Sequence, residues 1–156
     1  MSIREATDLA PHAVFVPGNH DRYAEYSSGA RAIVERYSPV VVAASIDEQY
    51  IDFAGCESLY RRPEDHDDDM TILRTIRAMT KAIDAELGLP ASAGIATSKS
   101  MAKVACTLAK PQGVMLVAAG TEESTLAPLG VRKLPRIGPV SERRLSRVGI
   151  HTLADL

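Results

Sequence analysis

The sequence predicts an α+β fold in which helices pack on one side of a mainly antiparallel sheet, and three observations support this class. Apolar residues recur at helical spacing in some segments and form short β-prone runs in others, in the order helix, strand, strand, helix, strand, helix, strand. Two of the strand-like runs follow each other directly, as in a hairpin. The 156 residues are 46% hydrophobic and 24% charged, which is typical of a globular chain. Interleaved helices and strands with a hairpin favour a layered α+β architecture.

The hairpin lies in residues 40–55, VVVAASIDEQYIDFAG. Residues 40–46 form an apolar run without alternation, which predicts a buried strand. Asp47 and Glu48 follow, and a second short strand is expected at residues 50–53. Neighbouring side chains on a regular strand face opposite ways, so the two acids converge only where the strand ends or bends. Such a pair can hold a hard cation such as Mg²⁺. It can equally be a turn with two solvated acids, and spacing alone favours the turn.

A helix is predicted over residues 20–37, with Asn19 as its N-cap and Ser38-Pro39 as its end. Its tyrosines, at helical spacing, are expected to face the core rather than a substrate: Tyr23, Tyr26 and Tyr37. The segment before it, residues 1–18, contains a short helix-like piece and a strand-like Ala-Val-Phe-Val run.

The polar loop at residues 61–69, RRPEDHDDD, places His66 among four aspartates. This cluster could indicate a metal site, but a solvated loop that ends in an aspartate N-cap is favoured, since acids are stabilised at a helix N-terminus. The next helix ends at Gly88. Its apolar face is predicted to consist of Ile72, Leu73, Ile76, Met79, Ile83 and Leu87.

A short strand at 91–96, a helix capped by Thr97-Ser98 and a strand at 114–117 follow. The helix is expected to bury Met101, Val104, Ala105 and Leu108. Three lysines project from this helix or its end: Lys99, Lys103 and Lys110.

The composition changes after about residue 118, where 120–130 reads as a short linking helix. Residues 134–156, LPRIGPVSERRLSRVGIHTLADL, show the pattern of a helix-hairpin-helix, with a helix from Ser141 to Arg147, a C-cap at Gly149 and a further helix starting at Thr152. Glycine in the hairpin lets the backbone approach a phosphate, and exposed N–H groups can hold it. Arginines supply local positive charge: Arg136, Arg143, Arg144 and Arg147. An ordinary α-hairpin with a solvated basic face is the alternative; the spacing favours binding to DNA phosphates.

The net charge of −2 excludes a global positive field that would attract nucleic acid or anionic lipid. Aromatic residues make up only 4% of the chain, so a broad base-stacking platform is not expected. No apolar run approaches the roughly 20 residues of a membrane span, and no signal peptide opens the chain. We therefore expect a cytoplasmic protein without a membrane partner.

Three stretches, taken together and in order, closely resemble the Y-family translesion (UmuC/DinB-like) DNA polymerases: SIDEQYIDFAG at 45–55, ASAGIATSKSMAKVACTLAKPQGV at 91–114, and the 134–156 segment. Residues 1–23 also resemble the segment before the family's acidic motif. The resemblance implies a division into the end of a fingers-like segment (1–18), a ferredoxin-like palm (19–118) and a partial helix-hairpin-helix thumb (119–156).

The resemblance also implies roles for individual residues. Asp47 and Glu48 match the family's catalytic acids, which bind Mg²⁺, two ions in the complete family site. Lys110 matches the lysine that contacts the incoming deoxynucleoside triphosphate, and Lys103 matches another basic position near the site. The hairpin that holds the backbone of primer-template DNA corresponds to Ile137, Gly138 and Pro139, with Arg136, Arg143 and Arg144 beside it. Gln49 stands where the family usually has a small residue.

The family's opening strand with a further aspartate, its fingers residues, the rest of its thumb and its C-terminal little-finger domain have no counterpart in these 156 residues. We therefore expect a fragment of a translesion DNA polymerase that alone has little or no activity and binds metal weakly. An unpaired palm-sheet edge would invite self-association. One alternative is a non-catalytic DNA-binding or assembly module built on a degenerate polymerase palm. Another is an unrelated α+β protein with a helix-hairpin-helix tail.

Overall fold

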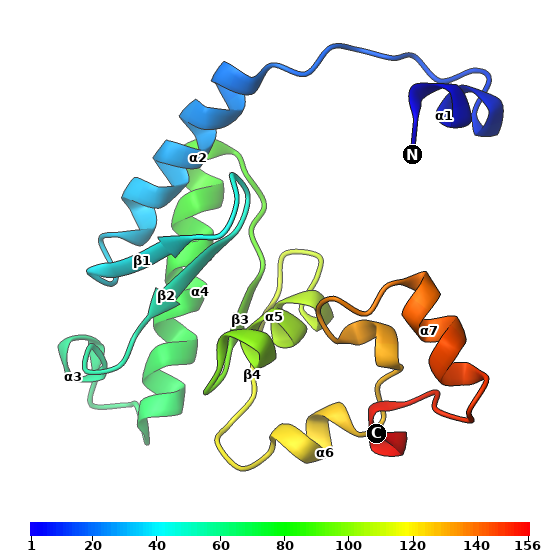
Figure 1. Ribbon diagram of the computed structural model, residues 1–156. Coiled ribbons are helices and arrows are strands. Elements are labelled where there is room, and N and C mark those ends of the chain that lie inside the picture. Colours follow the sequence, from blue (N-terminus) through cyan, green and yellow to red (C-terminus); the bar gives the residue numbers. More distant parts are fainter.

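The computed structural model describes all residues from 1 to 156 and has a mixed α+β fold (Figure 1). The first half contains α1 (Ile3–Leu9), α2 (His20–Val34), β1 (Val40–Ala43), β2 (Gln49–Asp52), α3 (Glu57–Tyr60) and α4 (Asp68–Leu87). The second half contains β3 (Ala93–Ile95), α5 (Lys99–Leu108), β4 (Val114–Leu116), α6 (Glu122–Leu126), the 3₁₀ turn η1 (Val131–Lys133), α7 (Pro139–Ser146) and the 3₁₀ turn η2 (Leu153–Asp155). The predicted order of the main helices and strands is confirmed.

The strands form two separate two-stranded sheets. β1 and β2 pair antiparallel, with Val40 opposite Asp52 and Ala43 opposite Gln49. β3 and β4 pair parallel, with α5 as the connection between them. The prediction of one mainly antiparallel sheet is therefore wrong. Pairing joins residues far apart in the sequence, and the apolar pattern of a short strand does not reveal the direction of its partner.

Helix α4 supports both sheets. Its N-terminus is capped by the Asp67 side chain, which accepts a hydrogen bond from the backbone N–H of Met70, and it ends at Gly88 with φ 65°. Its apolar face packs on the end of α2 in a core of five buried residues: Ile33, Val34, Ile76, Met79 and Ile83. Side chains from both strand pairs, including Ile51 and Ile95, contact this core. The two helices lie side by side behind the β1–β2 hairpin (Figure 1).

Helix α5 covers the face of the β3–β4 pair that α4 leaves open. Ala93 and Ile95 pack against the α4 core, so Gly94 between them points the other way. A Cβ atom on Gly94 would lie 2.0 Å from the carbonyl oxygen of Ala102, which shows how closely α5 approaches the strand. Helices thus flank this pair on both faces, and the prediction that they lie on one side is wrong.

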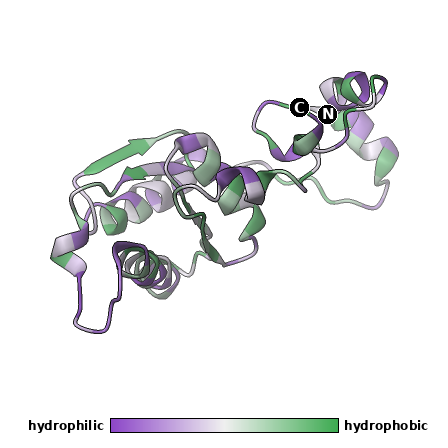
Figure 2. Cartoon of the chain, turned by 90° about the horizontal axis from the view of Figure 1, so that it is seen from below, coloured by the Kyte–Doolittle hydropathy of each residue, from purple (hydrophilic) through white to green (hydrophobic).

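Strand β1 is shorter and more exposed than predicted. It ends at Ala43, and Val40 and Val42 are 50% and 49% exposed. Only the alternate residue Val41 packs against the core, because a strand at the edge of a hairpin turns every second side chain away from the helices. The strand is coloured as hydrophobic in Figure 2, although two of its valines are exposed to solvent. A run of identical apolar residues conceals the alternation that would have revealed this.

Helix α2 begins as predicted, with the Arg22 N–H donating to the Asn19 side chain, but it ends at Val34. Tyr23 is exposed, which contradicts its expected core position, and Tyr26 lies under the Arg22 guanidinium. Tyr37, beyond the helix end, packs against the core and stacks on Tyr60, with 6.2 Å between ring centroids.

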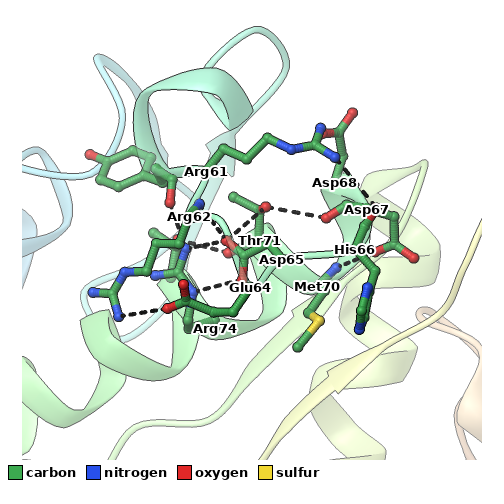
Figure 3. A network of polar contacts seen from close by, with 12 residues as sticks. Arg61, Arg62, Glu64, Asp65, His66, Asp67, Asp68, Met70, Thr71 and Arg74 are labelled. Carbon is green, nitrogen blue, oxygen red and sulfur yellow. Dashed lines mark hydrogen bonds and ion pairs between the residues drawn. The ribbon is translucent and has the colours of Figure 1, made fainter.

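The 61–69 loop is organised around a buried carboxylate rather than being wholly solvated (Figure 3). The side chain of Asp65 is fully buried and accepts hydrogen bonds from Arg74 Nη2 at 2.6 Å, Arg74 Nε at 3.1 Å and Thr71 Oγ1 at 3.1 Å. The Arg62 N–H completes its shell at 2.9 Å. The hydrogen bonds from Arg74 are the main reason that the pKa of Asp65 is held far below its ordinary value. His66 remains exposed and joins no group of metal-ligating side chains.

The two ends of the chain lie outside the α4 core. Helix α1 has no buried residue and is separated from α2 by an extended segment (Figure 1). The predicted strand at residues 13–16 is absent, and Val14 and Val16 are exposed. At the other end, Val131 is buried, and Gly130 forms an isolated bridge with Thr152. None of the helices is both long and apolar enough to cross a bilayer.

Candidate active site

Asp47 and Glu48 lie in the turn between β1 and β2, as the sequence predicts. The turn is closed by the N–H groups of Ala44 and Ser45, which both donate to the carbonyl oxygen of Glu48. The Ser45 hydroxyl donates to Oδ1 of Asp47 at 2.5 Å and holds that carboxylate in place. Asp47 is exposed, whereas Glu48 is partly buried. The two acids are therefore neighbours in the hairpin turn, where Asp47 is open to solvent and Glu48 is partly covered by the protein.

Lys103 reaches Glu48 from α5, although the two residues are 55 positions apart in the sequence. Its ammonium forms an ion pair with the Glu48 carboxylate. Helix α5 begins at Ser98, whose side chain accepts a hydrogen bond from the Met101 N–H, and burial of Val104 fixes its inner face. Lys103 therefore lies on the face of α5 that contacts the β1–β2 hairpin.

Lys99, one turn earlier on the same helix, lies over the ring of Tyr50, 5.6 Å from its centroid. The lysine and ring together make a second contact between α5 and β2 beside the ion pair. This contact was not predicted, because nothing in the sequence pairs a helix lysine with a strand tyrosine.

Hydrogen bonds and nearby lysine charges lower the pKa values of both acids. The pKa of Asp47 is lowered, chiefly by the hydrogen bond from Ser45 and further by the charges of Lys103 and Lys110. The pKa of Glu48 is lowered mainly by its hydrogen bond to Lys103, and the same contact raises the pKa of Lys103. At neutral pH both carboxylates are thus ionised and Lys103 is charged. The ion pair between Lys103 and Glu48 joins α5 to the hairpin turn that carries both acids.

The donor set fits one Mg²⁺. Carboxylate oxygens are the hard ligands this ion prefers, and proteins usually hold it through one or two carboxylates plus substrate phosphates. Asp47 and Glu48, adjacent in the β1–β2 turn, would supply the two carboxylates. No group of three or more His, Cys, Asp or Glu side chains that could hold a metal ion is present. The next residue, Gln49, carries a buried Oε1 atom without a hydrogen-bond partner. The resemblance marks Gln49 as a departure from the family pattern, but the burial of its amide oxygen was not predicted.

The predicted DNA-binding hairpin forms the start of α7. Gly138 is the N-cap and Pro139 the first residue, so the helix begins two residues before the predicted Ser141. Ile137 is partly buried, and Gly138 has open space around it, with no atom within 4 Å of an added Cβ. Pro139 is favoured at this position because its missing N–H would be unpaired in any case. The Asp155 carboxylate accepts hydrogen bonds from the backbone N–H and the hydroxyl of Thr152. The predicted second helix is only the 3₁₀ turn η2.

The arginines of this segment are exposed and form no ion pair: Arg136, Arg143, Arg144 and Arg147. Arg132, by contrast, forms an ion pair with Glu142, with 3.6 Å between Nε and Oε2. Arg136 also has a φ of 74°, an unusual backbone conformation that the sequence did not reveal. Figure 1 shows α7 on the opposite side of the molecule from the β1–β2 hairpin. The basic segment around α7 and the β1–β2 hairpin that carries the two acids are thus separate parts of the molecule.

Comparisons with known proteins show which family the chain resembles in sequence and in overall fold. The sequence profile of the impB/mucB/samB family matches residues 1–107. DNA polymerase IV of Moorella thermoacetica is 36% identical over the whole chain, which covers 37% of that protein. DNA polymerase IV of Dehalococcoides mccartyi strain BAV1 is 40% identical over the whole chain and 38% of its own length. The chain therefore spans well under half of the curated relatives it matches.

Solved structures show the same fold. The crystal structure of DinB from Sulfolobus solfataricus superposes with a TM-score of 0.83 at 26% identity, over 98% of this chain and 42% of that one. The insertion ternary complex of Dbh DNA polymerase gives a TM-score of 0.82 at 26% identity, over 99% of this chain and 43% of that one. The chain belongs to the impB/mucB/samB family and is a homologue of the Y-family DNA polymerase IV (DinB) enzymes.

Proposed function

We propose that this chain carries the acidic half of a metal-dependent nucleotidyl-transfer site that extends the 3′ end of a primer on template DNA. One observation carries the proposal: Lys103 of α5 forms an ion pair with Glu48, which lies beside Asp47 in the turn between β1 and β2. Mg²⁺ is usually bound through one or two carboxylates together with substrate phosphates, and lysine ammonium groups can bind the phosphates.

The acidic residues would bind the metal ion and the lysines would bind the phosphates of the substrate. Asp47 and Glu48 would hold Mg²⁺, which when bound neutralises charge on the phosphates and on the attacking oxygen. Lys110, which is exposed just after the end of α5, would bind the triphosphate, with Lys103 as a second cation. Nucleotidyl transfer depends mainly on positioning and electrostatic stabilisation, and these four side chains would supply part of both.

The α7 hairpin would bind the DNA backbone. The exposed, unpaired arginines at 136, 143 and 144 can contact phosphates, and the free space at Gly138 leaves room for a backbone to approach residues 137–139. Contacts to phosphate carry no sequence information, so this binding is expected to depend on salt and not on sequence.

The same proposal divides the chain into a fingers-like end (1–18), a palm-like unit (19–118) and a partial thumb (119–156). Each strand of the two pairs has one unpaired edge, which supports self-association through a sheet edge as a further expectation. With two carboxylates alone, this chain by itself is expected to show little or no primer extension.

Binding of a fluorescent deoxynucleoside triphosphate in the presence of Mg²⁺ tests the site without requiring turnover. We expect saturable binding that is weakened by Asp47→Asn and by Lys110→Met. Lys81→Met, which removes an exposed lysine of α4 that forms no ion pair, is the matched control and should leave binding unchanged. Equal binding in all four proteins would contradict the proposal and would favour a non-catalytic DNA-binding module.

A further inference from the structure

The ion pair between Lys103 and Glu48 occupies the carboxylate that a metal ion would need. Lys103 donates to Oε2 of Glu48, and the two side chains are 39% and 29% exposed, so water screens the contact only in part. Asp47 has a different partner, the Ser45 hydroxyl, which carries no charge and leaves the acid open to solvent. The two acids are therefore unequal: one is free to take a cation and the other already has one.

The position of the ammonium is fixed by the fold. Met101, Val104 and Ala105 anchor α5 in the protein, and its backbone lies against Gly94 of β3. Lys99 on the same face contacts Tyr50, two residues after Glu48. A lysine held this way stays near the acids even when its own side chain moves, so its charge acts on any ion bound there.

We infer that Lys103 is a positioning residue that serves as the internal counter-ion of Glu48 and competes with divalent cations for that carboxylate. A cation can use Glu48 fully only when the ammonium has moved to another anion, and a substrate phosphate is the obvious one. This inference rests on the proposed metal site. If Lys103 instead oriented Glu48 for the metal, its removal would weaken metal binding, so the two roles predict changes of opposite sign.

Mn²⁺ titration followed by electron paramagnetic resonance measures the competition directly, because free and bound ions give different signals. Lys103→Met removes the charge and keeps the length of the side chain. We expect it to bind Mn²⁺ on the order of fivefold to tenfold more tightly than the wild type, since one nearby positive charge is lost. Lys103→Arg keeps the charge and should retain the wild-type affinity, and Lys81→Met should also match the wild type.

A second variant separates competition from a general change in charge. In a Glu48→Gln background the counter-ion has lost its partner, so Lys103→Met should give a clearly smaller gain than in the wild type. If Lys103→Met binds Mn²⁺ as weakly as the wild type, or more weakly, the inference is wrong while the metal site stands. If neither protein binds Mn²⁺ saturably, the proposed metal site fails and the inference fails with it.

Discussion

Replacement of Gly94 by alanine is the sharpest test of how the fold positions the site. The added Cβ would lie 2.0 Å from the carbonyl oxygen of Ala102, 2.3 Å from the backbone nitrogen of Cys106 and 2.9 Å from the carbonyl carbon of Ala105. Ordinary contacts of a Cβ atom begin at 3.4 Å, so helix α5 has to move away from β3. All three obstacles are backbone atoms, and no change of rotamer can relieve them.

The magnitude follows from two opposing effects. Overpacking of a well-packed core typically costs about 1–3 kcal/mol, and a backbone obstacle places Gly94→Ala at or above the upper end. Alanine also restricts the unfolded chain more than glycine does, which by itself would stabilise the folded state by about 0.4–1 kcal/mol. We therefore expect the free energy of unfolding to fall by about 2 kcal/mol or more. The same movement of α5 carries Lys103 away from Glu48.

Urea unfolding followed by circular dichroism measures this loss, because the free energy of unfolding falls linearly with denaturant. Gly18→Ala is the matched control: a Cβ there meets its nearest atom, on Tyr23, at 3.6 Å, an ordinary contact. An unchanged or increased free energy of unfolding for Gly94→Ala would refute the close packing of α5 on β3, and with it the placement of Lys103.

Two further predictions concern the loop and the basic hairpin. Asp65→Asn should lower the free energy of unfolding at neutral pH much more than Asp69→Asn, because Asp65 is buried with Arg74 whereas Asp69 is exposed. Since folding lowers the pKa of Asp65, its contribution to the free energy of unfolding is fully present above its unfolded pKa of about 4 and is lost as the pH falls below that value. The free energy of unfolding of Asp65→Asn should therefore decline less steeply in acid than that of the wild type, and identical curves would contradict this. Arg143→Ala with Arg144→Ala should weaken DNA binding equally for all sequences and reduce the salt dependence by roughly two phosphate contacts, whereas Arg31→Ala, an arginine paired with Glu35, should not; loss confined to one DNA sequence would argue against phosphate binding.

Local features of this fold could be predicted from the sequence, because they depend on neighbouring residues. Asn19, Asp67 and Ser98 all cap helices through their own side chains, and Gly88 ends α4 in the left-handed conformation. Each of these depends on the residue type and on one or two turns of chain. The position of Asp47 and Glu48 in a turn followed from the same kind of argument.

Features that depend on distant residues were predicted less well. Parallel pairing of β3 and β4 and the two-sided cover of that pair arise from the path of α5, which no pattern within a three-residue strand can show. Asp65 is chemically the same as its exposed neighbours, and only the arrival of Arg74 from α4 makes it the buried member of the group. Resemblance suggested that Lys103 lies near the acids, but the direct pair with Glu48 is a property of the folded chain.

The central claim is that Asp47 and Glu48 form a divalent-cation site, and Mn²⁺ binding to the metal-free protein tests it most directly. We expect weak, saturable binding to the wild type that is lost in Asp47→Asn and unchanged in Asp84→Asn, which removes an exposed acid of α4. Binding of equal strength in the wild type and Asp47→Asn, or no saturable binding in either, would contradict the account.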